Sequence, residues 1–229
     1  MTIIFKNFKE LEFEYNNCAP TWKSQNKATN KLGSNLVQLY CLLRDTFFEA
    51  HSKKTDIPQD IKTWKHTFVP ENLKDSSSDI LSLYNYSLSG ALDILQEWQK
   101  GRQHGYIAYK NINGMRVNAG LVIFEEKNIN GKHFVYIVEA GVYERGKGIG
   151  HALMDCVLMH YPEKTEFYIG TRIFNKEAIG LYQNCLKFEP LNAEAVKEYM
   201  GLDERYRGFA HTTSREELAL IRNKISSLN

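Results

Sequence analysis

Residues 140–150 read AGVYERGKGIG, a turn with four glycines and two cations between two stretches of different periodicity. The stretch before it, residues 134–138, consists of β-branched and aromatic residues and predicts a strand. The stretch after it predicts a helix that ends before Pro162. One face of this helix would carry Ile149, Leu153, Cys156, Val157 and His160. The glycine-rich turn therefore joins a strand to the N-terminus of a helix.

This turn has the features of an anion site. The first amides of a helix have no intrahelical partner, and the helix dipole places partial positive charge there. Gly146, Gly148 and Gly150 have no Cβ to block a ligand from these amides, and they can adopt positive φ without strain. Arg145 and Lys147 add positive charge. We expect the turn to bind a phosphate group.

Two common phosphate motifs do not fit the turn. Residues 141–148 come close to the nucleoside-triphosphate pattern GxxxxGK followed by Ser or Thr, but position 148 is a glycine and offers no hydroxyl for Mg²⁺. The dinucleotide pattern GxGxxG also fails, because the residue three positions after Gly148 is His151 rather than glycine or alanine. The sequence therefore argues against a nucleoside triphosphate and against a nicotinamide cofactor.

A second strand and helix follow the first pair. Residues 165–171 predict a short strand, and Asn175 is placed to cap the helix after it. One face of that helix would carry Ala178, Leu181, Tyr182 and Cys185. Because a helix separates the two strands, we expect them to run parallel through a right-handed crossover.

Both units carry a signature of one known family. The pattern Arg-x-x-Gly-x-Gly of residues 145–150 resembles the pyrophosphate loop of the GCN5-related N-acetyltransferase (GNAT) family. The pattern Asn-x-x-Ala-x-x-Leu-Tyr of residues 175–182 resembles its second signature, and the resemblance covers roughly residues 104–190. The family usually has glycine and then phenylalanine five positions after the tyrosine, whereas here Lys187 precedes Phe188 and the interval is six. We therefore expect a locally different end to this helix.

The resemblance implies an α/β fold, in which helices flank a mixed, mostly antiparallel central sheet and two parallel strands splay apart. It implies acetyl-CoA as the cosubstrate, no metal, and direct transfer of the acetyl group to a primary amine. Tyr182 matches the tyrosine that in many members protonates the leaving thiolate. The resemblance also implies a bulge near the end of the strand 132–140, where free backbone amides of Val138 to Ala140 would polarise the acetyl carbonyl. The residues that would bind the cosubstrate are Val138 and Ala140 through their backbone, Asn175, and the turn residues Arg145, Gly146, Lys147, Gly148, Ile149 and Gly150.

The general base is less clearly indicated. Some members use a glutamate on the strand before the turn, and the matching position here is Phe134. The alternatives nearby are Glu139 at the end of that strand, Glu125 and Glu126 on the adjacent strand, and His133, whose ordinary pKa is near neutral. Glu139 is the best placed of these by its location. A chain of water molecules could serve instead.

The acceptor is not encoded in either signature. We expect a small-molecule amine, with the lysine or N-terminus of a polypeptide as the alternative. A CoA-binding regulatory module without turnover is a third hypothesis, suggested by the absent strand glutamate and the altered helix end. Residues 52–87 offer a criterion, because an insertion that walls the acceptor side would favour a small amine, whereas an open groove would favour a polypeptide.

The middle of the chain predicts an antiparallel meander. The pairs Asn113-Gly114 and Asn130-Gly131 each predict a tight hairpin. Residues 105–110, 117–126 and 132–140 would then be three consecutive strands that lead into the glycine-rich turn.

The flanks are assigned by periodicity alone, within a single expected domain of residues 1–229. The region 1–103 would shape the acceptor site with strands at 2–5 and 11–15, an insertion at 52–87 with short helices, and two helices that cover the sheet. Their apolar faces would be Leu32, Leu36, Leu39, Tyr40, Leu43 and Phe47, and then Leu88, Ala91, Leu92, Leu95 and Trp98 before Gly101. The extension 191–229 would end in a helix with a capping box at Ser214 and Glu217 and an apolar stripe of Leu218, Ile221 and Ile225.

Composition narrows the remaining classes. With 29 basic and 27 acidic residues the net charge is +2, which does not support a surface for nucleic acid or an anionic membrane. No apolar run is long enough to span a bilayer, and the N-terminal apolar run is too short for a signal peptide, so we expect a cytoplasmic protein. An oligomer is compatible with the sequence but not indicated by it.

The four cysteines, at positions 18, 41, 156 and 185, show no CxxC spacing, and we expect free thiols, with Cys156 and Cys185 on core faces. Cys156 and His160 share a helix face, where packing is the simpler interpretation than a metal site or a thiol with its base.

Overall fold

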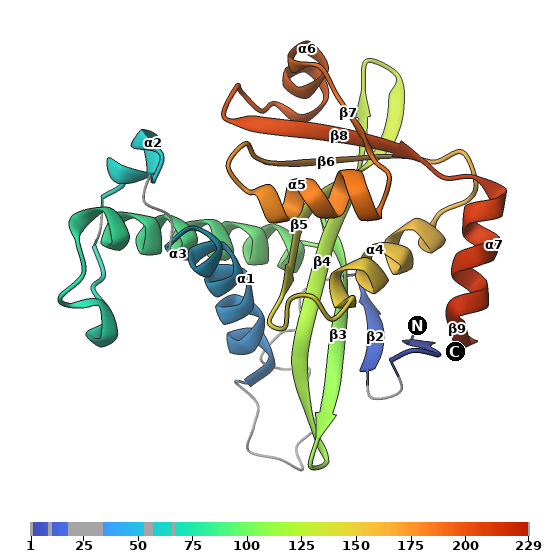
Figure 1. Ribbon diagram of the computed structural model, residues 1–229, viewed down its shortest axis with the longest axis horizontal. Coiled ribbons are helices and arrows are strands. Elements are labelled where there is room, and N and C mark those ends of the chain that lie inside the picture. Colours follow the sequence, from blue (N-terminus) through green and yellow to red (C-terminus); the bar gives the residue numbers. More distant parts are fainter. Residues whose placement is uncertain (1, 9–10, 18–33, 53–56, 66, 229) are drawn as a thin grey trace.

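The computed structural model describes residues 2–8, 11–17, 34–52, 57–65 and 67–228. Within them, nine strands form one sheet in the order β7-β8-β6-β5-β4-β3-β2-β1-β9, and helices lie on both of its faces (Figure 1). Every neighbouring pair is antiparallel except β5 and β6, which are parallel. The expected α/β fold with a mixed, mostly antiparallel sheet is confirmed.

The strands are β1 (Thr2–Phe5), β2 (Leu11–Asn16), β3 (His104–Ile112), β4 (Met115–Ile129), β5 (Lys132–Val142), β6 (Glu166–Arg172), β7 (Glu189–Pro190), β8 (Tyr206–Thr212) and β9 (Ile225–Leu228). The α-helices are α1 (Ser34–Ser52), α2 (Gln59–Lys62), α3 (Ser78–Gln99), α4 (Ile149–His160), α5 (Lys176–Gly180), α6 (Ala193–Ala195) and α7 (Arg215–Lys224). A 3₁₀ turn, η1 (Glu71–Leu73), and two π-helical turns, η2 (Leu181–Cys185) and η3 (Val196–Met200), complete the elements. The sequence patterns do not predict β7, β8 or β9, and Ile225, predicted on the apolar stripe of the last helix, is instead the first residue of β9.

The two Asn-Gly pairs make the hairpins that they predict. Asn113 and Gly114 have φ of 52° and 76°, and Asn130 and Gly131 have φ of 54° and 79°. Positive φ at both central residues is the geometry of a type I′ turn, which suits the right-handed twist of the strands. The meander β3-β4-β5 is confirmed, and all three strands are longer than their periodicity indicates.

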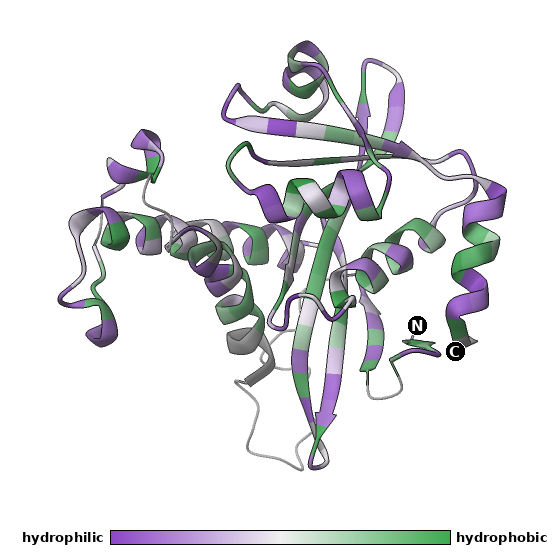
Figure 2. Cartoon of the chain, in the orientation of Figure 1, coloured by the Kyte–Doolittle hydropathy of each residue, from purple (hydrophilic) through white to green (hydrophobic). Residues whose placement is uncertain are grey.

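Side chains alternate between the two faces of the sheet, and different helices cover each face. Helices α1 and α3 pack on the face of Ile107 and Leu121, together with Leu95 and Trp98. Helices α4 and α7 and the turn η2 pack on the opposite face, which carries Tyr106. Figure 2 shows α7 with both apolar and polar residues, and its Leu218 and Ile221 are buried as expected. Because β1 pairs with β9, the first and last strands lie side by side (Figure 1).

The boundary of the insertion differs from the prediction. Helix α3 begins at Ser78, so about ten residues assigned to the insertion belong to this helix, and Ser77 caps it. Leu92, predicted on the apolar face, is 46% exposed, because only the narrow stripe of Ala91, Leu95 and Trp98 reaches the sheet. In α1, Leu39 and Leu43 are buried as expected. Leu32 and the side chain of Leu36 lie outside the described residues, as does Cys18.

The altered end of the second signature helix is a π-helical turn. In η2 the amide of Leu186 donates to the carbonyl of Leu181 at 3.0 Å, five residues back, and this wider turn accommodates the additional residue. The turn also rotates the apolar face, so that Leu186 is buried and Cys185, predicted in the core, is exposed. Lys187 has φ of 59°, a conformation that favours glycine, at the position where the signature usually has one.

Candidate active site

The two parallel strands separate as the resemblance implies. β5 and β6 pair at three positions only, the last of which joins Ile137 to Ile169, although both strands continue beyond it. Beyond this point β5 has a bulge, because Ile137 and Glu139 face consecutive residues of β4 and Val138 faces none. The bulge and the gap between the strands lie at the same level of the sheet.

The glycine-rich turn lies at one side of this gap and leads into α4. Gly146 and Gly148 have φ of 71° and 76°, so both require a residue that tolerates the left-handed region. Gly148 is the N-cap of α4. Among the described residues, the amides of residues 144–151 donate to no backbone carbonyl. The turn therefore presents a row of amide donors at a helix N-terminus, as an anion site requires.

A cleft of about 550 Å³, here called the glycine-loop cleft, runs along this turn. Its lining includes seven of the nine predicted cosubstrate residues. The other two are Lys147, which is exposed, and Val138. The seven are Ala140, Arg145, Gly146, Gly148, Ile149, Gly150 and Asn175. Helix α1 forms the opposite wall, where Arg145 Nη2 donates to the Thr46 carbonyl at 3.3 Å. A Cβ at Gly141 would lie 2.8 Å from Thr46 Oγ1, so this glycine allows α1 to pack against the strand end.

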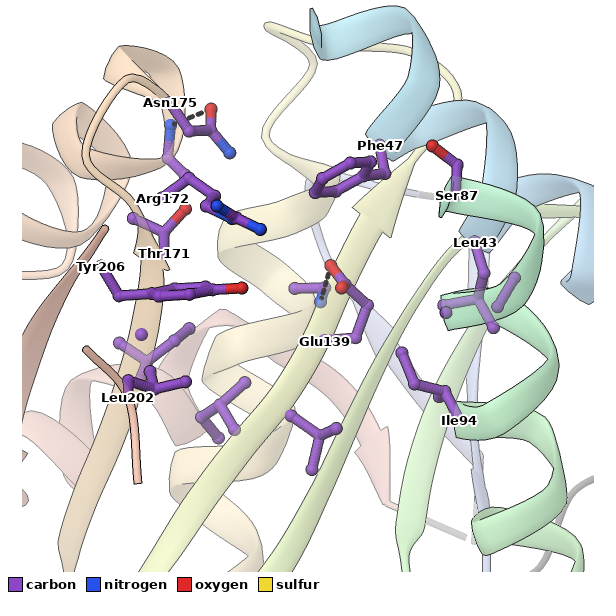
Figure 3. A pocket seen from close by; sticks show the side chains of 18 of the residues that line it. Leu43, Phe47, Ser87, Ile94, Glu139, Thr171, Arg172, Asn175, Leu202 and Tyr206 are labelled. Carbon is purple, nitrogen blue, oxygen red and sulfur yellow. Dashed lines mark hydrogen bonds between the residues drawn. The ribbon is translucent and has the colours of Figure 1, made fainter. Parts of the chain in front are cut away.

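A second cavity of about 480 Å³ lies at the other side of the strand gap. It is called the insertion cavity, because Trp64 of the insertion and Tyr86 and Ser87 of α3 form one wall. The end of β6 and the segment before β8 form the facing wall, with Thr171, Arg172, Leu202 and Tyr206 (Figure 3). Val138 also lines this cavity.

The two cavities meet at a shared rim. The residues that line both are Phe47, Glu139, Ala140, Asn175, Ala178 and Tyr182. In Figure 3 the Glu139 carboxylate points into the space between β5 and the end of β6. The amide of Ala140 donates to Glu139 Oε1 at 3.1 Å instead of remaining free. Desolvation raises the pKa of Glu139 to about 7, although the hydrogen bond from Ala140 lowers it.

Tyr182 lies in η2, and its side chain is only 7% exposed. Its ring packs edge-on against Phe209, with the centroids 5.7 Å apart. Burial raises the pKa of the Tyr182 hydroxyl, and the nearby Glu139 and Tyr136 raise it further, so the hydroxyl stays protonated at neutral pH. Asn175 caps α5, since its Oδ1 accepts from the Ala178 amide at 3.4 Å.

The other candidate bases lie outside both cavities. Glu125 pairs with Lys127 at 3.0 Å, and Glu126 accepts from the Tyr161 hydroxyl at 3.2 Å. His133 is exposed and contacts Asn128. Phe134, at the position of the absent glutamate, is buried in an apolar cluster and 3% exposed.

The facing wall of the insertion cavity is not predicted by the sequence patterns. Arg172 is the last residue of β6 and Tyr206 the first of β8, and neither belongs to a signature or to an apolar stripe. A cation at the end of a strand beside the splayed pair is the one signal that could have indicated Arg172.

The comparison with family models gives a match over residues 36–188, to the acetyltransferase (GNAT) family. This span is two thirds of the chain and includes the strand gap, the turn and the shared rim. The chain belongs to the GNAT family. It is therefore an N-acetyltransferase, and acetyl-CoA is its cosubstrate. A search of curated proteins found no match.

Three solved structures are similar to this chain at low identity. One is the acetyl transferase from Salmonella typhimurium that modifies the N-terminal serine of ribosomal protein L7/L12, with 13% identity, 93% of this chain and 100% of that chain covered, and a TM-score of 0.50. RimL, a ribosomal L7/L12 alpha-N-protein acetyltransferase in complex with coenzyme A, is 15% identical, with 93% of this chain and 98% of that chain covered and a TM-score of 0.48. NAA60 from Arabidopsis thaliana in complex with acetyl-CoA is 18% identical, with 52% of this chain and 82% of that chain covered and a TM-score of 0.40. Likeness at this level concerns the fold alone.

The GNAT chain has residues that fit the cosubstrate. The amide donors of the turn and the guanidinium of Arg145 suit a pyrophosphate. The space beside Gly146 is open to a ligand, because a Cβ added there would meet no atom within 4 Å. No group of three or more metal-ligating side chains gathers in the described part of the chain. Among the same residues, no helix combines the length and apolarity that a bilayer crossing requires.

Proposed function

We propose that this acetyltransferase moves the acetyl group of acetyl-CoA directly to a primary amine of a small molecule. The insertion cavity supports this acceptor class, because Trp64 and Tyr86 wall the acceptor side and leave a space of about 480 Å³. By the criterion taken from the sequence, such a wall favours a small amine over a polypeptide. The glycine-loop cleft would hold acetyl-CoA, and the two substrates would meet at the shared rim.

Glu139 is the proposed general base. A primary amine is mostly protonated at neutral pH and must lose a proton before it can attack a carbonyl carbon. A carboxylate with a pKa of about 7 is suited to accept that proton near neutral pH. Among the described residues, Glu139 is the one carboxylate that lines both cavities, since Glu144 and Glu177 line the cleft alone and Asp93 the insertion cavity alone.

The backbone at the bulge is proposed to polarise the acetyl carbonyl. In the structure the Ala140 N–H is engaged by Glu139 Oε1. When acetyl-CoA is bound, it supplies an activated thioester, and the Ala140 N–H would then donate to the carbonyl oxygen in place of Oε1. The exchange would release the Glu139 carboxylate toward the amine, so that one hydrogen bond couples cosubstrate binding to the base.

Tyr182 is the proposed general acid. The residue lines both cavities, and its hydroxyl remains protonated at neutral pH because burial raises its pKa. The hydroxyl would donate its proton to the departing thiolate sulfur. Arg145 and the turn amides up to Gly150 would hold the pyrophosphate, Lys147 would add charge from the surface, and Asn175 would contact the pantetheine or nucleotide end.

A polypeptide acceptor is the second candidate. The insertion carries three exposed apolar side chains close together in sequence, namely Trp64 at 40%, Phe68 at 51% and Val69 at 41% exposure. Such a surface beside the insertion cavity could contact a peptide that places its N-terminus at the shared rim.

The test is a thiol-release assay with acetyl-CoA and a panel of amino acids, polyamines, aminoglycosides and peptides, with the product identified by its mass. We expect acetylation of at least one small amine. The proposal fails if the protein binds acetyl-CoA but releases thiol only with peptides, and it fails entirely if no amine is acetylated.

A further inference from the structure

Arg172, a buried cation that lines the insertion cavity, has one nitrogen without a hydrogen-bond partner among the described residues. Arg172 is 4% exposed, and its guanidinium donates to Asp60 Oδ2 at 2.9 Å, to Asp60 Oδ1 at 3.3 Å and to the Tyr86 hydroxyl at 2.9 Å. These bonds use both terminal nitrogens. Nε is buried and has no hydrogen-bond partner among the described residues. A buried donor without a partner costs free energy, so this atom points to a ligand group that accepts a hydrogen bond.

Aromatic rings fix the guanidinium in this position. Its Cζ lies 4.6 Å from the centroid of the Tyr206 ring and 5.6 Å from that of Tyr86. Figure 3 shows Arg172 and the Tyr206 hydroxyl on one side of the cavity and the Glu139 carboxylate on the other. The donor is therefore held rigidly by a pair of rings and an ion pair, as a specificity site requires.

The charges around Asp60 leave the Arg172 side of the cavity without excess negative charge. Asp60 Oδ2 also pairs with Arg205 at 2.8 Å, so one carboxylate faces two guanidinium groups. Burial acts to raise the pKa of Asp60, but the hydrogen bond from Arg172 and the charges of Arg172 and Arg205 outweigh it and lower that pKa, which keeps the carboxylate ionised. Arg205 has a second partner in Asp203. The cavity thus has a carboxylate at the shared rim and hydrogen-bond donors at the far wall.

We propose that the acceptor is a small primary amine that also carries a carboxylate or carbonyl oxygen, which accepts a hydrogen bond from Arg172 Nε while the amine lies at Glu139. This inference rests on the proposed function. It makes Arg172 a specificity residue and amino acids, or compounds with the same pair of groups, the acceptor class. A site built around such a donor rejects analogues that lack the oxygen, because Nε would then stay unpaired.

The experiment compares acceptors in matched sets of three. Each set contains an L-amino acid, its amide and the corresponding decarboxylated amine, for leucine, phenylalanine and methionine, with acetyl-CoA and thiol release as the readout. We expect kcat/KM for the decarboxylated amine to be at least about 10-fold below that of the better of the other two. The amide separates the two oxygen types, since it keeps the carbonyl and removes the charge. Equal rates within every set, or turnover with polyamines or aminoglycosides but with no set, would overturn the inference while leaving the proposed function intact. No turnover with any of these amines would overturn the proposed function itself.

The variant Arg172→Lys tests the residue. It keeps a cation but removes the planar fork, and we expect its kcat/KM for the oxygen-bearing acceptors to fall to the level of the decarboxylated amine, which itself changes little. A merely structural role would lower kcat/KM for all acceptors alike. Arg207→Lys is the matched control, because Arg207 is exposed on β8, opposite Thr171 in register, and outside both cavities.

If Arg172→Lys does not fold, Asp60→Asn provides the second test. This change leaves Nε in place and removes the anion that compensates Arg172, so the preference for the carboxylate over the amide should rise. An unchanged or lower preference in a folded Asp60→Asn protein would contradict the inference. Acetyl-CoA binding by calorimetry verifies that the glycine-loop cleft is intact in each variant.

Discussion

Replacement of Glu139 by glutamine tests the proposed base most directly. The glutamine side chain would have the same shape and could still accept the Ala140 amide, but it could not take a proton. Loss of a positioned base lowers turnover by roughly 10²- to 10⁴-fold, so we expect a fall of that size in kcat/KM. Acetyl-CoA affinity should change little, because the turn and Arg145 are untouched.

The pH profile gives the sharper signature. With a pKa of about 7, Glu139 is about 9% ionised at pH 6 and about 91% ionised at pH 8, so its ionisation alone raises kcat/KM about tenfold between these values. In Glu139→Gln this rise of kcat/KM between pH 6 and pH 8 should disappear, whereas any pH dependence that comes from ionisation of the acceptor amine should remain. Glu125→Gln is the control, because Glu125 pairs with Lys127 outside both cavities. A Glu139→Gln enzyme with the rate and pH dependence of the native protein would refute the assignment.

Stability gives an independent measurement on the same variant. The pKa of Glu139 is raised from 4.5 to about 7 in the folded protein, so between these values the folded state holds a proton that the unfolded state has lost. The stability of the native protein should therefore decline as pH rises through this window, and this contribution is lost above pH 7. Glutamine does not titrate. Thermal unfolding should show the stability of Glu139→Gln rising relative to that of the native protein as pH rises toward 8, and a difference that stays constant with pH would contradict the raised pKa.

Three further predictions concern Tyr182, the glycine-rich turn and Lys187. Tyr182→Phe should lower kcat by roughly 10²-fold or more with little loss of acetyl-CoA affinity, as measured by steady-state kinetics and calorimetry; an unchanged kcat would exclude it as the acid. Gly148→Ala should lose about 1 kcal/mol of unfolding free energy and weaken acetyl-CoA binding, since φ is 76° and the new Cβ would lie 3.2 Å from Phe8 Cζ. Gly146→Ala should lose less stability, because φ is 71° but the new Cβ would meet open space. Equal losses in the two variants would contradict a role for the contact with Phe8. Lys187→Gly should stabilise the fold by up to about 1 kcal/mol in thermal unfolding, because φ is 59°, and a loss of stability would show that Lys187 makes contacts that outweigh its strain.

Local chemistry explains what the sequence predicts well. Each Asn-Gly pair needs positive φ at adjacent residues, and the glycine-rich turn needs it at Gly146 and Gly148, so these segments encode their own geometry. The bulge at Val138 and the gap after Ile137 follow from the family resemblance rather than from periodicity. The bulge lies near the end of β5, where the resemblance places it.

Contacts between distant segments explain what the sequence does not predict. Arg172 acquires its role only when Asp60 of α2 and Tyr86 of α3 reach it, more than 80 positions away. Cys185 fits a helical stripe, but the wider turn of η2 gives its place to Leu186. Helical periodicity assumes a uniform turn and therefore fails where one extra residue is accommodated.

The early end of the pairing between β5 and β6 also bears on how the molecule moves. Beyond Ile137 and Ile169, the facing edges of the two strands have no ladder bonds to each other, so the sheet has a seam at its centre. Amides along this seam should exchange with deuterium sooner than those of β3 and β4, which are paired along most of their length. A ligand whose own amides lie in the seam would restore the missing bonds from within, so binding should tighten the two halves of the sheet against each other.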